Sequence, residues 1–155
     1  MKRFPRVPPR LSCTFANNPV YFATVCTYWR RTWLATDAVN QAFVRFAERA
    51  YSEHNIAVGR YVIMPDHIHL FVCGADNFEL GRWIGLLKQC LAKSVLRVPS
   101  ADPVWERGCF DHVLRNDESY AQKWNYVREN PVRAGLVANV DDWPYAGEII
   151  TIDRV

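Results

Sequence analysis

The sequence predicts an α+β fold: a ferredoxin-like antiparallel sheet of the order β-α-β-β-α-β with an additional C-terminal helix. Two observations predict this class. Segments rich in β-branched and aromatic residues alternate with segments whose apolar residues recur at helical spacing. The turn dipeptide Pro65-Asp66 joins the middle strands into an antiparallel hairpin. The 155 residues, 50% of them hydrophobic, are enough for one domain with a substantial core.

Each expected element has its own local signal. The first strand is dense in β-branched and aromatic residues, and the first helix begins after an N-cap at Thr36. The second helix presents an apolar stripe from Leu80 to Val95, and the third stops at Asn130 because Pro131 follows. The expected strands cover residues 20–30, 56–64, 67–73 and 109–114, and the expected helices cover residues 37–54, 80–95 and 117–130.

The chain divides into three expected parts. Residues 1–15 form a basic, proline-rich arm, residues 16–147 form the main domain, and residues 148–155 form a short C-terminal tail. The net charge of +3 and the pI of about 8.7 are mildly basic. This excess of basic over acidic residues is consistent with a polyanionic partner such as a nucleic acid.

The cysteines and the hydropathy pattern indicate the cellular compartment in which the protein is expected. The five cysteines are odd in number and scattered, which indicates neither a disulfide framework nor a cysteine-built zinc site. No apolar run is long enough to span a bilayer, and the basic start MKRFPRVPPR is not followed by a signal-peptide segment. We therefore expect a cytoplasmic protein in a reducing compartment, without a membrane partner.

Two histidines stand two residues apart in the expected strand MPDHIHLFV. Because side chains alternate along a strand, His67 and His69 share one face with Phe71, and the apolar residues between them form the other face. Two neutral imidazoles side by side suit a divalent cation, although a third ligand must come from elsewhere. A structural pair of histidines is the alternative when this motif is taken alone.

The third helix, NDESYAQKWNYVREN, carries a tyrosine outside its apolar stripe. Tyr126 and Asn130 lie together on another side of the helix, with Lys123 beside them. The phenol of Tyr126 could attack the phosphorus of a phosphodiester, and the amide oxygen of Asn130 could complete a metal site. A surface tyrosine is the alternative. Asp111 and His112 on the fourth strand either support a ligand histidine by a hydrogen bond or are structural.

These motifs resemble those of a known family. HIH within MPDHIHLFV looks like the HUH motif of histidine, hydrophobic residue and histidine. The segments KWNYVRENPVRAGLV and WERGCFDHVLRNDESY resemble those of the REP-associated tyrosine transposases, which are relatives of the single-tyrosine insertion-sequence transposases. The similarity extends from Val20 to about Tyr145, and it identifies residues 16–147 as an HUH transposase domain.

The resemblance implies a metal-dependent endonuclease and strand transferase that nicks and rejoins hairpin-forming single-stranded DNA, as a monomer or a homodimer. It implies that Tyr126 leaves a 5′-phosphotyrosine and a free 3′-OH, and that Mg²⁺ or Mn²⁺ is the metal. The implied metal ligands are His67, His69 and Asn130. Insertion-sequence relatives often have glutamine at the position of Asn130. Ligand softness favours Zn²⁺ or Mn²⁺ over Mg²⁺ for two imidazoles, so the physiological metal stays open.

Six basic residues are candidates for DNA contacts, because neutralisation of phosphates dominates affinity for nucleic acids. They are Lys88, Lys93, Arg97, Lys123, Arg30 and Arg31. Two other functions compete with the transposase interpretation. A nucleotide hydrolase of the histidine-triad type would need a third histidine where Phe71 stands, which argues against it. A domesticated nucleic-acid-binding module without cleavage activity stays open, and formation of a covalent DNA adduct would distinguish it.

Overall fold

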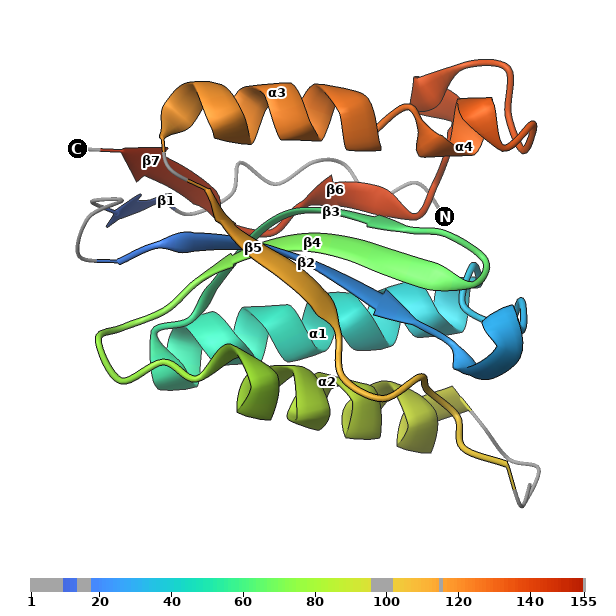
Figure 1. Ribbon diagram of the computed structural model, residues 1–155, viewed down its shortest axis with the longest axis horizontal. Helices are drawn as coiled ribbons and strands as arrows, with labels where there is room; N and C mark the ends of the chain where they lie inside the picture. Colours follow the sequence, from blue (N-terminus) through green and yellow to red (C-terminus); the bar gives the residue numbers. More distant parts are fainter. Residues whose placement is uncertain (1–9, 14–17, 96–101, 115, 155) are drawn as a thin grey trace.

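The fold is built on one five-stranded antiparallel sheet with helices on both of its faces (Figure 1). The computed structural model describes residues 10–13, 18–95, 102–114 and 116–154. The sheet has the order β5-β2-β4-β3-β6, so the strand with the two histidines lies at its centre. Its strands are β2 (Val20–Cys26), β3 (Ala57–Ile63), β4 (His67–Cys73), β5 (Phe110–Leu114) and β6 (Ala146–Glu148).

Two helices cover one face of the sheet and a third covers the other (Figure 1). The paired helices are α1 (Asp37–His54) and α2 (Leu80–Val95), and α3 (Asp117–Val127) lies across the opposite face. Helix α1 begins after the predicted N-cap Thr36, whose hydroxyl accepts a hydrogen bond from the N–H of Val39 at 3.2 Å. The chain order and the strand order confirm the predicted ferredoxin-like fold with an additional C-terminal helix.

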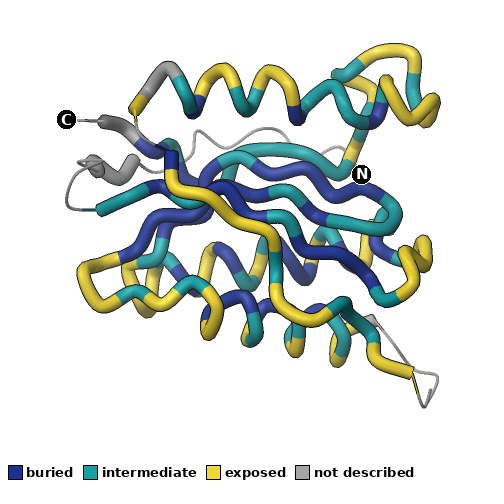
Figure 2. The backbone as a smooth tube through the Cα atoms, in the orientation of Figure 1, coloured by how far each residue is buried: buried dark blue, intermediate teal, exposed yellow. Residues whose placement is uncertain are grey.

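The alternation of side chains along β4 separates two hydrophobic layers. Ile68, Leu70 and Val72 belong to the larger layer, between the sheet and helices α1 and α2. Phe71 belongs to the smaller layer under α3, where its ring lies 4.6 Å from that of Tyr120. Figure 2 shows the buried strands between the two helical layers. The predicted division of β4 into an apolar face and a histidine face is confirmed.

Gly59 allows α3 to approach the sheet closely. A side chain at this position would place its Cβ 2.6 Å from the hydroxyl oxygen of Tyr120. The same hydroxyl accepts a hydrogen bond from the backbone N–H of Arg60 at 3.2 Å. The position of α3 over β3 therefore depends on a contact that a larger residue at position 59 would break.

The third helix ends earlier than the sequence predicts. It begins after Asn116, whose side chain accepts a hydrogen bond from Ser119, but it stops at Val127 rather than at Asn130. A separate turn, α4 (Asn130–Arg133), follows. The reason is Pro131, which has no N–H to donate to the carbonyl of Val127 and so interrupts the hydrogen-bond ladder.

The first strand is also shorter than predicted. It ends at Cys26, and residues Tyr28–Arg30 form a short 3₁₀ turn, η1. Trp29 and Arg30 have φ of +53°, in the left-handed region that a strand does not contain. Aromatic and β-branched composition alone does not distinguish such a turn from a continuing strand.

Both ends of the chain contribute strands that the sequence did not indicate. Strand β1 (Arg10–Cys13) pairs in parallel with β7 (Thr151–Arg154), and β6 extends the main sheet along β3 after a short turn, η2 (Val140–Asp142). The division into arm, domain and tail stays a prediction, and residues 1–9 of the arm lie outside the described residues. No helix in the described part of the chain has the length and apolarity of a membrane span.

Candidate active site

His67 and His69 lie side by side on β4, on the face of the sheet that α3 covers. The centroids of their rings are 4.7 Å apart, and the ring planes stand at 78° to each other. The side chain of His67 is 15% exposed, and His69 is half-buried. The structure therefore places the two imidazoles side by side, as predicted. Part of the His67 side chain remains accessible to solvent.

The Nδ1 atom of each histidine is held by a neighbouring oxygen. Nδ1 of His67 lies 2.7 Å from Oδ1 of Asp66, and Nδ1 of His69 lies 2.8 Å from Oγ1 of Thr24. An ionised carboxylate only accepts hydrogen bonds, so Nδ1 of His67 carries the proton and the Nε2 lone pair is free in the neutral ring. Protein metal sites use this arrangement to orient their ligand histidines.

The environment of His69 keeps its ring neutral. Burial is the main cause that lowers the pKa of His69 to about 3. The other causes are the positive charges of nearby groups, which are His67, Lys123, Arg30 and Arg133. A neutral imidazole is the form that binds a metal ion. His69 is therefore ready to act as a ligand at any physiological pH.

Asp66 connects the histidine pair to Arg30. Nε of Arg30 donates to Oδ2 of Asp66 at 2.8 Å, and Nη1 of Arg30 lies 3.0 Å from Sγ of Cys26. Burial alone would raise the pKa of Asp66, but the hydrogen bonds from His67 and Arg30 outweigh it and hold the pKa below its usual value. Asp66 is thus an anion that orients both His67, a candidate metal ligand, and the guanidinium of Arg30. Arg30, a predicted DNA contact, lies at the histidine site.

Phe22 and Lys123 form a stack beside His69. The ring of Phe22 is nearly parallel to that of His69, with centroids 5.3 Å apart, and Nζ of Lys123 lies 4.8 Å from the Phe22 centroid. This contact is a cation–π interaction that brings a positive charge from α3 to the histidine face. The predicted position of Lys123 close to the site is consistent with its effect on the pKa of His69.

Asp111 and His112, which the sequence left open between a supporting and a structural role, do not hold the histidine pair. Asp111 is exposed and pairs in register with Ala23, whose side chain belongs to the layer under α1 and α2. His112 packs its ring 5.6 Å from that of Phe22. The supporting hydrogen bonds come from Asp66 and Thr24 instead.

Tyr126, Asn130 and Arg133 form a contact group where α3 meets α4. Tyr126 is 64% exposed. The guanidinium of Arg133 lies over its ring, with Cζ 4.1 Å from the centroid, and donates to the backbone oxygen of Tyr126 at 2.8 Å. Arg133 also donates to Oδ1 of Asn130, the oxygen that the sequence analysis assigns to a metal. Tyr126 and Asn130 are therefore linked through one arginine.

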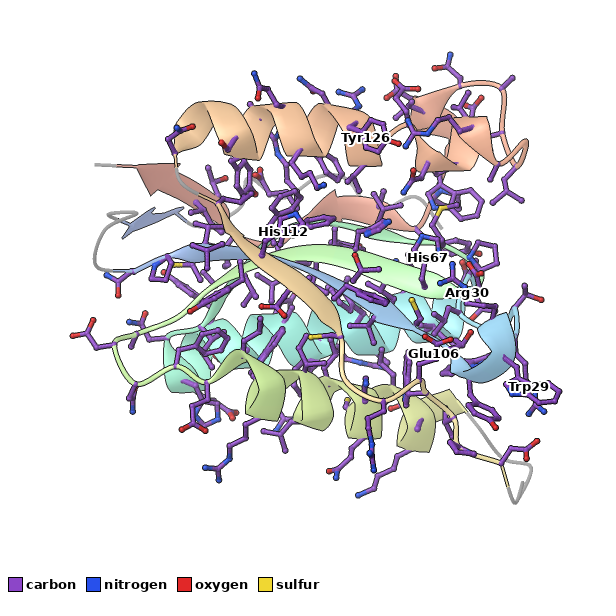
Figure 3. All side chains as sticks on the ribbon, in the orientation of Figure 1. Trp29, Arg30, His67, Glu106, His112 and Tyr126 are labelled. Atoms are coloured by element: carbon purple, nitrogen blue, oxygen red, sulfur yellow. The ribbon has the colours of Figure 1, made fainter. Side chains whose placement is uncertain are left out.

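Arg133 also connects this group to the histidines. Its charge contributes to the lowered pKa of His69, so it lies within electrostatic range of that ring. Figure 3 shows Tyr126 and His67 toward the same end of the molecule, one in the helical layer and one in the sheet. No group of three or more His, Cys, Asp or Glu side chains within the described ranges is arranged to hold a metal ion.

Three of the four remaining predicted DNA contacts, Lys88, Lys93 and Arg31, lie in the described part of the chain. The ammonium of Lys88 donates to the backbone oxygens of Glu106 and Gly108, at 2.9 and 2.6 Å, so the structure gives it an internal role. Lys93 is exposed on α2, on the opposite face of the sheet from α3. Arg31 pairs with Asp102 at 2.7 Å, and Arg97 lies outside the described residues.

The comparisons with known proteins agree with this architecture. The family model described as "Transposase IS200 like" matches residues 17–113. A Haemophilus influenzae protein assigned as a REP-associated tyrosine transposase is 30% identical over 149 residues, which cover 85% of this chain and 81% of that protein. The REP-associated tyrosine transposase of Escherichia coli K12 is 29% identical over 92 residues, which cover 57% of this chain and 52% of that protein.

Two solved structures share the fold. One is described as a REP-associated tyrosine transposase bound to a REP hairpin, with a TM-score of 0.68 and 21% identity over 94% of this chain and 82% of that one. The other, a crystal structure assigned as a transposase from Deinococcus radiodurans, has a TM-score of 0.52 and 13% identity over 72% of this chain and 90% of that one.

The fold and these matches define a DNA-processing protein of the transposase class. The chain belongs to the IS200-like transposase family, and two of its curated relatives are assigned as REP-associated tyrosine transposases, as the sequence motifs predict.

Sequence reasoning missed three residues at the candidate site. The sequence shows Asp66 as part of a turn dipeptide, and its place next to His67 is a usable signal of a role at the site. Thr24 becomes a partner of His69 only through the register of β2 against β4. Arg133 contacts Tyr126 only because the chain turns between α3 and α4, and the sequence carries no sign of that contact.

Proposed function

We propose that the protein nicks and rejoins hairpin-forming single-stranded DNA through a 5′-phosphotyrosine intermediate on Tyr126. The observation that carries this proposal is the pair of imidazoles whose Nδ1 atoms are held by Asp66 and Thr24. It is supported by the family membership and by the REP hairpin bound to a solved protein of the same fold. A cytoplasmic protein would meet such DNA directly.

The donor atoms present fit a divalent cation, Mg²⁺ or Mn²⁺. His67 and His69 would hold it through Nε2, and Asn130 would add Oδ1 once Arg133 releases that oxygen. When bound, the cation polarises a phosphoryl oxygen and orients the phosphodiester. The protein's own part is to fix both rings through the two Nδ1 contacts and to keep His69 neutral through burial.

Tyr126 supplies the nucleophile in this proposal. Its phenol oxygen bonds to phosphorus while the bond from phosphorus to the 3′ oxygen breaks. The phenol proton is lost, and the departing 3′ oxygen takes up a proton, so a free 3′-OH and a 5′-phosphotyrosine result. Attack of a 3′-OH on the phosphotyrosine reverses these steps and rejoins the strand without ATP.

The direct test is adduct formation with end-labelled hairpin DNA that carries single-stranded flanks. We expect the wild-type protein with Mn²⁺ to give a cleaved strand and a protein–DNA adduct on a denaturing gel. Tyr126→Phe removes only the nucleophilic oxygen, so it should abolish both products while DNA binding persists. Tyr21→Phe is the matched control, because Tyr21 lies on β2 in the layer under α1 and α2.

A binding module without cleavage activity predicts a different result. The wild-type protein would then shift the mobility of the hairpin on a native gel and leave no adduct under any metal condition. An adduct of equal yield in the Tyr126→Phe variant would instead show that another residue is the nucleophile.

A further inference from the structure

The turn from Thr27 to Arg31 holds two consecutive residues in the left-handed region. Trp29 and Arg30 both have a φ of +53°. This conformation is uncommon for residues other than glycine and, to a lesser degree, asparagine. It persists only where surrounding contacts impose it, and such positions concentrate at functional sites. The geometry therefore points to a role beyond connecting β2 to α1.

Buried Thr27 ties this turn to the hairpin turn before His67. Its N–H donates to the backbone oxygen of Asp66 at 3.0 Å, and its hydroxyl lies 2.8 Å from the backbone oxygen of Arg31. The guanidinium of Arg30 adds an ion pair to the carboxylate of Asp66 at 2.8 Å. The strained turn and the histidine strand are thus held as one unit.

Trp29 projects from this unit into solvent (Figure 3). It is 76% exposed, and its ring is stacked on that of Tyr28, with centroids 5.8 Å apart and planes at 25°. A ring this exposed contributes little to the core. Open aromatic faces are what single-stranded nucleic-acid-binding proteins use to stack unpaired bases.

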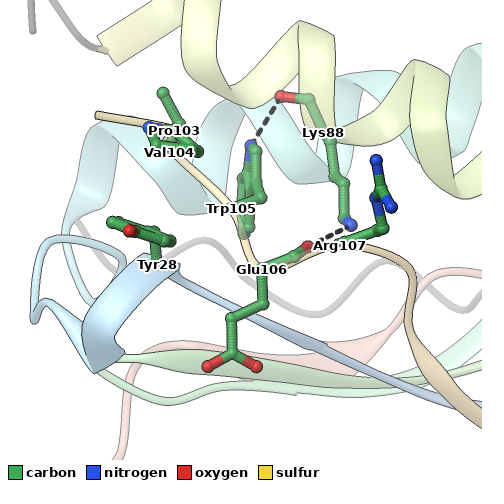
Figure 4. A pocket seen from close by; sticks show the side chains of 7 residues that line it. All are labelled: Tyr28, Lys88, Pro103, Val104, Trp105, Glu106 and Arg107. Atoms are coloured by element: carbon green, nitrogen blue, oxygen red, sulfur yellow. Dashed lines mark hydrogen bonds between the residues drawn. The ribbon is translucent and has the colours of Figure 1, made fainter. Parts of the chain in front are cut away.

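Tyr28 also lines an open hollow beside the turn (Figure 4). The hollow has a volume of about 760 Å³, within the usual range of about 300–1,000 Å³ for small-molecule sites. Tyr28 and a second aromatic residue, Trp105, form part of its wall. The remaining lining residues are Lys88, Pro103, Val104, Glu106 and Arg107.

The charges of the hollow suit a nucleotide. The exposed Arg107 offers the hollow a guanidinium, and the charge of Lys88, whose ammonium is held by backbone oxygens, adds to the positive potential against the single carboxylate of Glu106. A guanidinium suits a backbone phosphate, and a carboxylate accepts a hydrogen bond from the exocyclic amine of a base. Aromatic walls with a net positive charge therefore favour a strand of DNA over an acidic or purely apolar partner.

We propose that Trp29, Tyr28 and the adjoining hollow bind an unpaired nucleobase in the single-stranded flank of the substrate hairpin. This inference rests on the proposed function and names a part of the substrate that the same site recognises. Arg30 joins the two parts, because its Nε donates to Asp66, whose other carboxylate oxygen holds Nδ1 of His67. Paired stem bases are covered on both faces by their neighbours, so this surface selects the unpaired flank.

The test compares binding of two labelled DNAs in the Tyr126→Phe background, where no strand is cut. One is a blunt hairpin, and the other is the same hairpin with a single-stranded flank. Trp29→Asn removes the ring while asparagine tolerates the left-handed turn. We expect Trp29→Asn to weaken binding of the flanked DNA by roughly 5- to 100-fold, which corresponds to the loss of one base stack, and to leave the blunt hairpin unchanged. Trp29→Phe should restore most of the affinity.

Leu86→Asn is the matched control, since Leu86 is 51% exposed on α2 and does not line the hollow. It should bind both DNAs as the parent does. A 2-aminopurine base in the flank should be quenched on binding by the parent and remain fluorescent with Trp29→Asn. Equal affinity of the parent and Trp29→Asn for the flanked DNA would overturn the inference, as would an equal loss for both DNAs.

The outcome separates this inference from the proposed function. A normal adduct in the wild-type protein, together with flank binding that does not depend on Trp29, would refute the flank site alone. Flank binding that depends on Trp29, with no adduct in the wild-type protein, would refute the nicking activity alone.

Discussion

The guanidinium of Arg133 lies over the ring of Tyr126, with Cζ 4.1 Å from the ring centroid, while the same guanidinium donates to Oδ1 of Asn130. The proposed nucleophile and the proposed third metal ligand are thus both engaged by one cation. A cation at this place opposes the binding of a second, divalent cation. Arg133 must therefore move away when Asn130 joins a metal site.

Arg133→Met tests this competition. The substitution removes the charge and the hydrogen-bond donors but keeps much of the side-chain length, so Asn130 is released. We expect Mn²⁺ to bind the DNA-free variant roughly 3- to 10-fold more tightly than the wild-type protein, as expected when a nearby like charge is removed. Titration calorimetry measures the change directly.

Arg82→Met controls for the loss of one net positive charge, since Arg82 is exposed on α2. It should leave the Mn²⁺ affinity unchanged. Weaker Mn²⁺ binding by Arg133→Met would show that Arg133 supports the metal site rather than competing with it.

Asp66→Asn tests the support of His67. The carboxylate of Asp66 lies 2.7 Å from Nδ1 of His67, and an amide in its place keeps the shape but loses the charge. We expect Mn²⁺ affinity to fall by about 10-fold, at the lower end of what loss of such a partner costs. The readout is the same calorimetric titration, in the absence of DNA.

Asp102→Asn is the control for this change, because it breaks the exposed ion pair with Arg31 and so also neutralises one carboxylate. Its Mn²⁺ affinity should match that of the wild-type protein. Unchanged affinity in a folded Asp66→Asn variant would mean that the orientation of His67 does not depend on the carboxylate.

Local sequence signals were sufficient for most of the fold. The N-cap at Thr36, the start of the third helix at Asp117 and the strand His67–Cys73 follow from short-range preferences and from alternation, and the structure has them at the predicted residues. Strands β1, β6 and β7 were missed because they are short and depend on partners far along the chain.

The site was predictable only where one segment contains the whole signal. The histidine pair lies on a single strand, so its geometry follows from alternation alone. The contact between Thr24 and His69 depends on the register of two strands, and the left-handed turn at Trp29 depends on Thr27 bonding to Asp66. Such contacts are set by tertiary structure, which a pattern along the chain does not encode.

The pH dependence of stability should reveal the neutral state of His69. Its pKa falls from 6.5 in the unfolded chain to about 3 in the folded protein, so only the unfolded chain gains a proton here as the pH falls below 6.5. The stabilisation from the neutral ring is complete above pH 6.5 and is lost as the pH falls toward 3. The contribution of His69 to the slope of the free energy of unfolding against pH approaches about 1.4 kcal/mol per pH unit.

Urea unfolding of the wild-type protein and of His69→Gln, at several pH values in that range, measures this effect. The difference in the free energy of unfolding between the two proteins should shrink steadily as the pH falls. His54 lies at the exposed end of α1. The difference in the free energy of unfolding between His54→Gln and the wild-type protein should stay constant over the same pH range. A constant difference between the wild-type protein and His69→Gln would contradict the lowered pKa.

Lys88 should matter for stability more than for DNA binding. Its ammonium satisfies the backbone oxygens of Glu106 and Gly108, and thereby joins α2 to the segment that leads into β5 (Figure 4). Lys88→Met leaves both oxygens without this donor, so we expect the free energy of unfolding to fall by about 1–2 kcal/mol. Lys93→Met, one to two turns further along the exposed side of α2, should change it by less than about 0.5 kcal/mol.

Chemical denaturation and fluorescence anisotropy with labelled hairpin DNA separate the two roles of Lys88. If the lysine is structural, Lys88→Met is less stable, and at a temperature where it remains folded it binds the hairpin as Lys93→Met does. A variant of unchanged stability that loses hairpin affinity and shows a shallower salt dependence would instead establish Lys88 as a phosphate contact. The two hydrogen bonds to backbone oxygens, which occupy the ammonium inside the protein, are the reason to expect the first result.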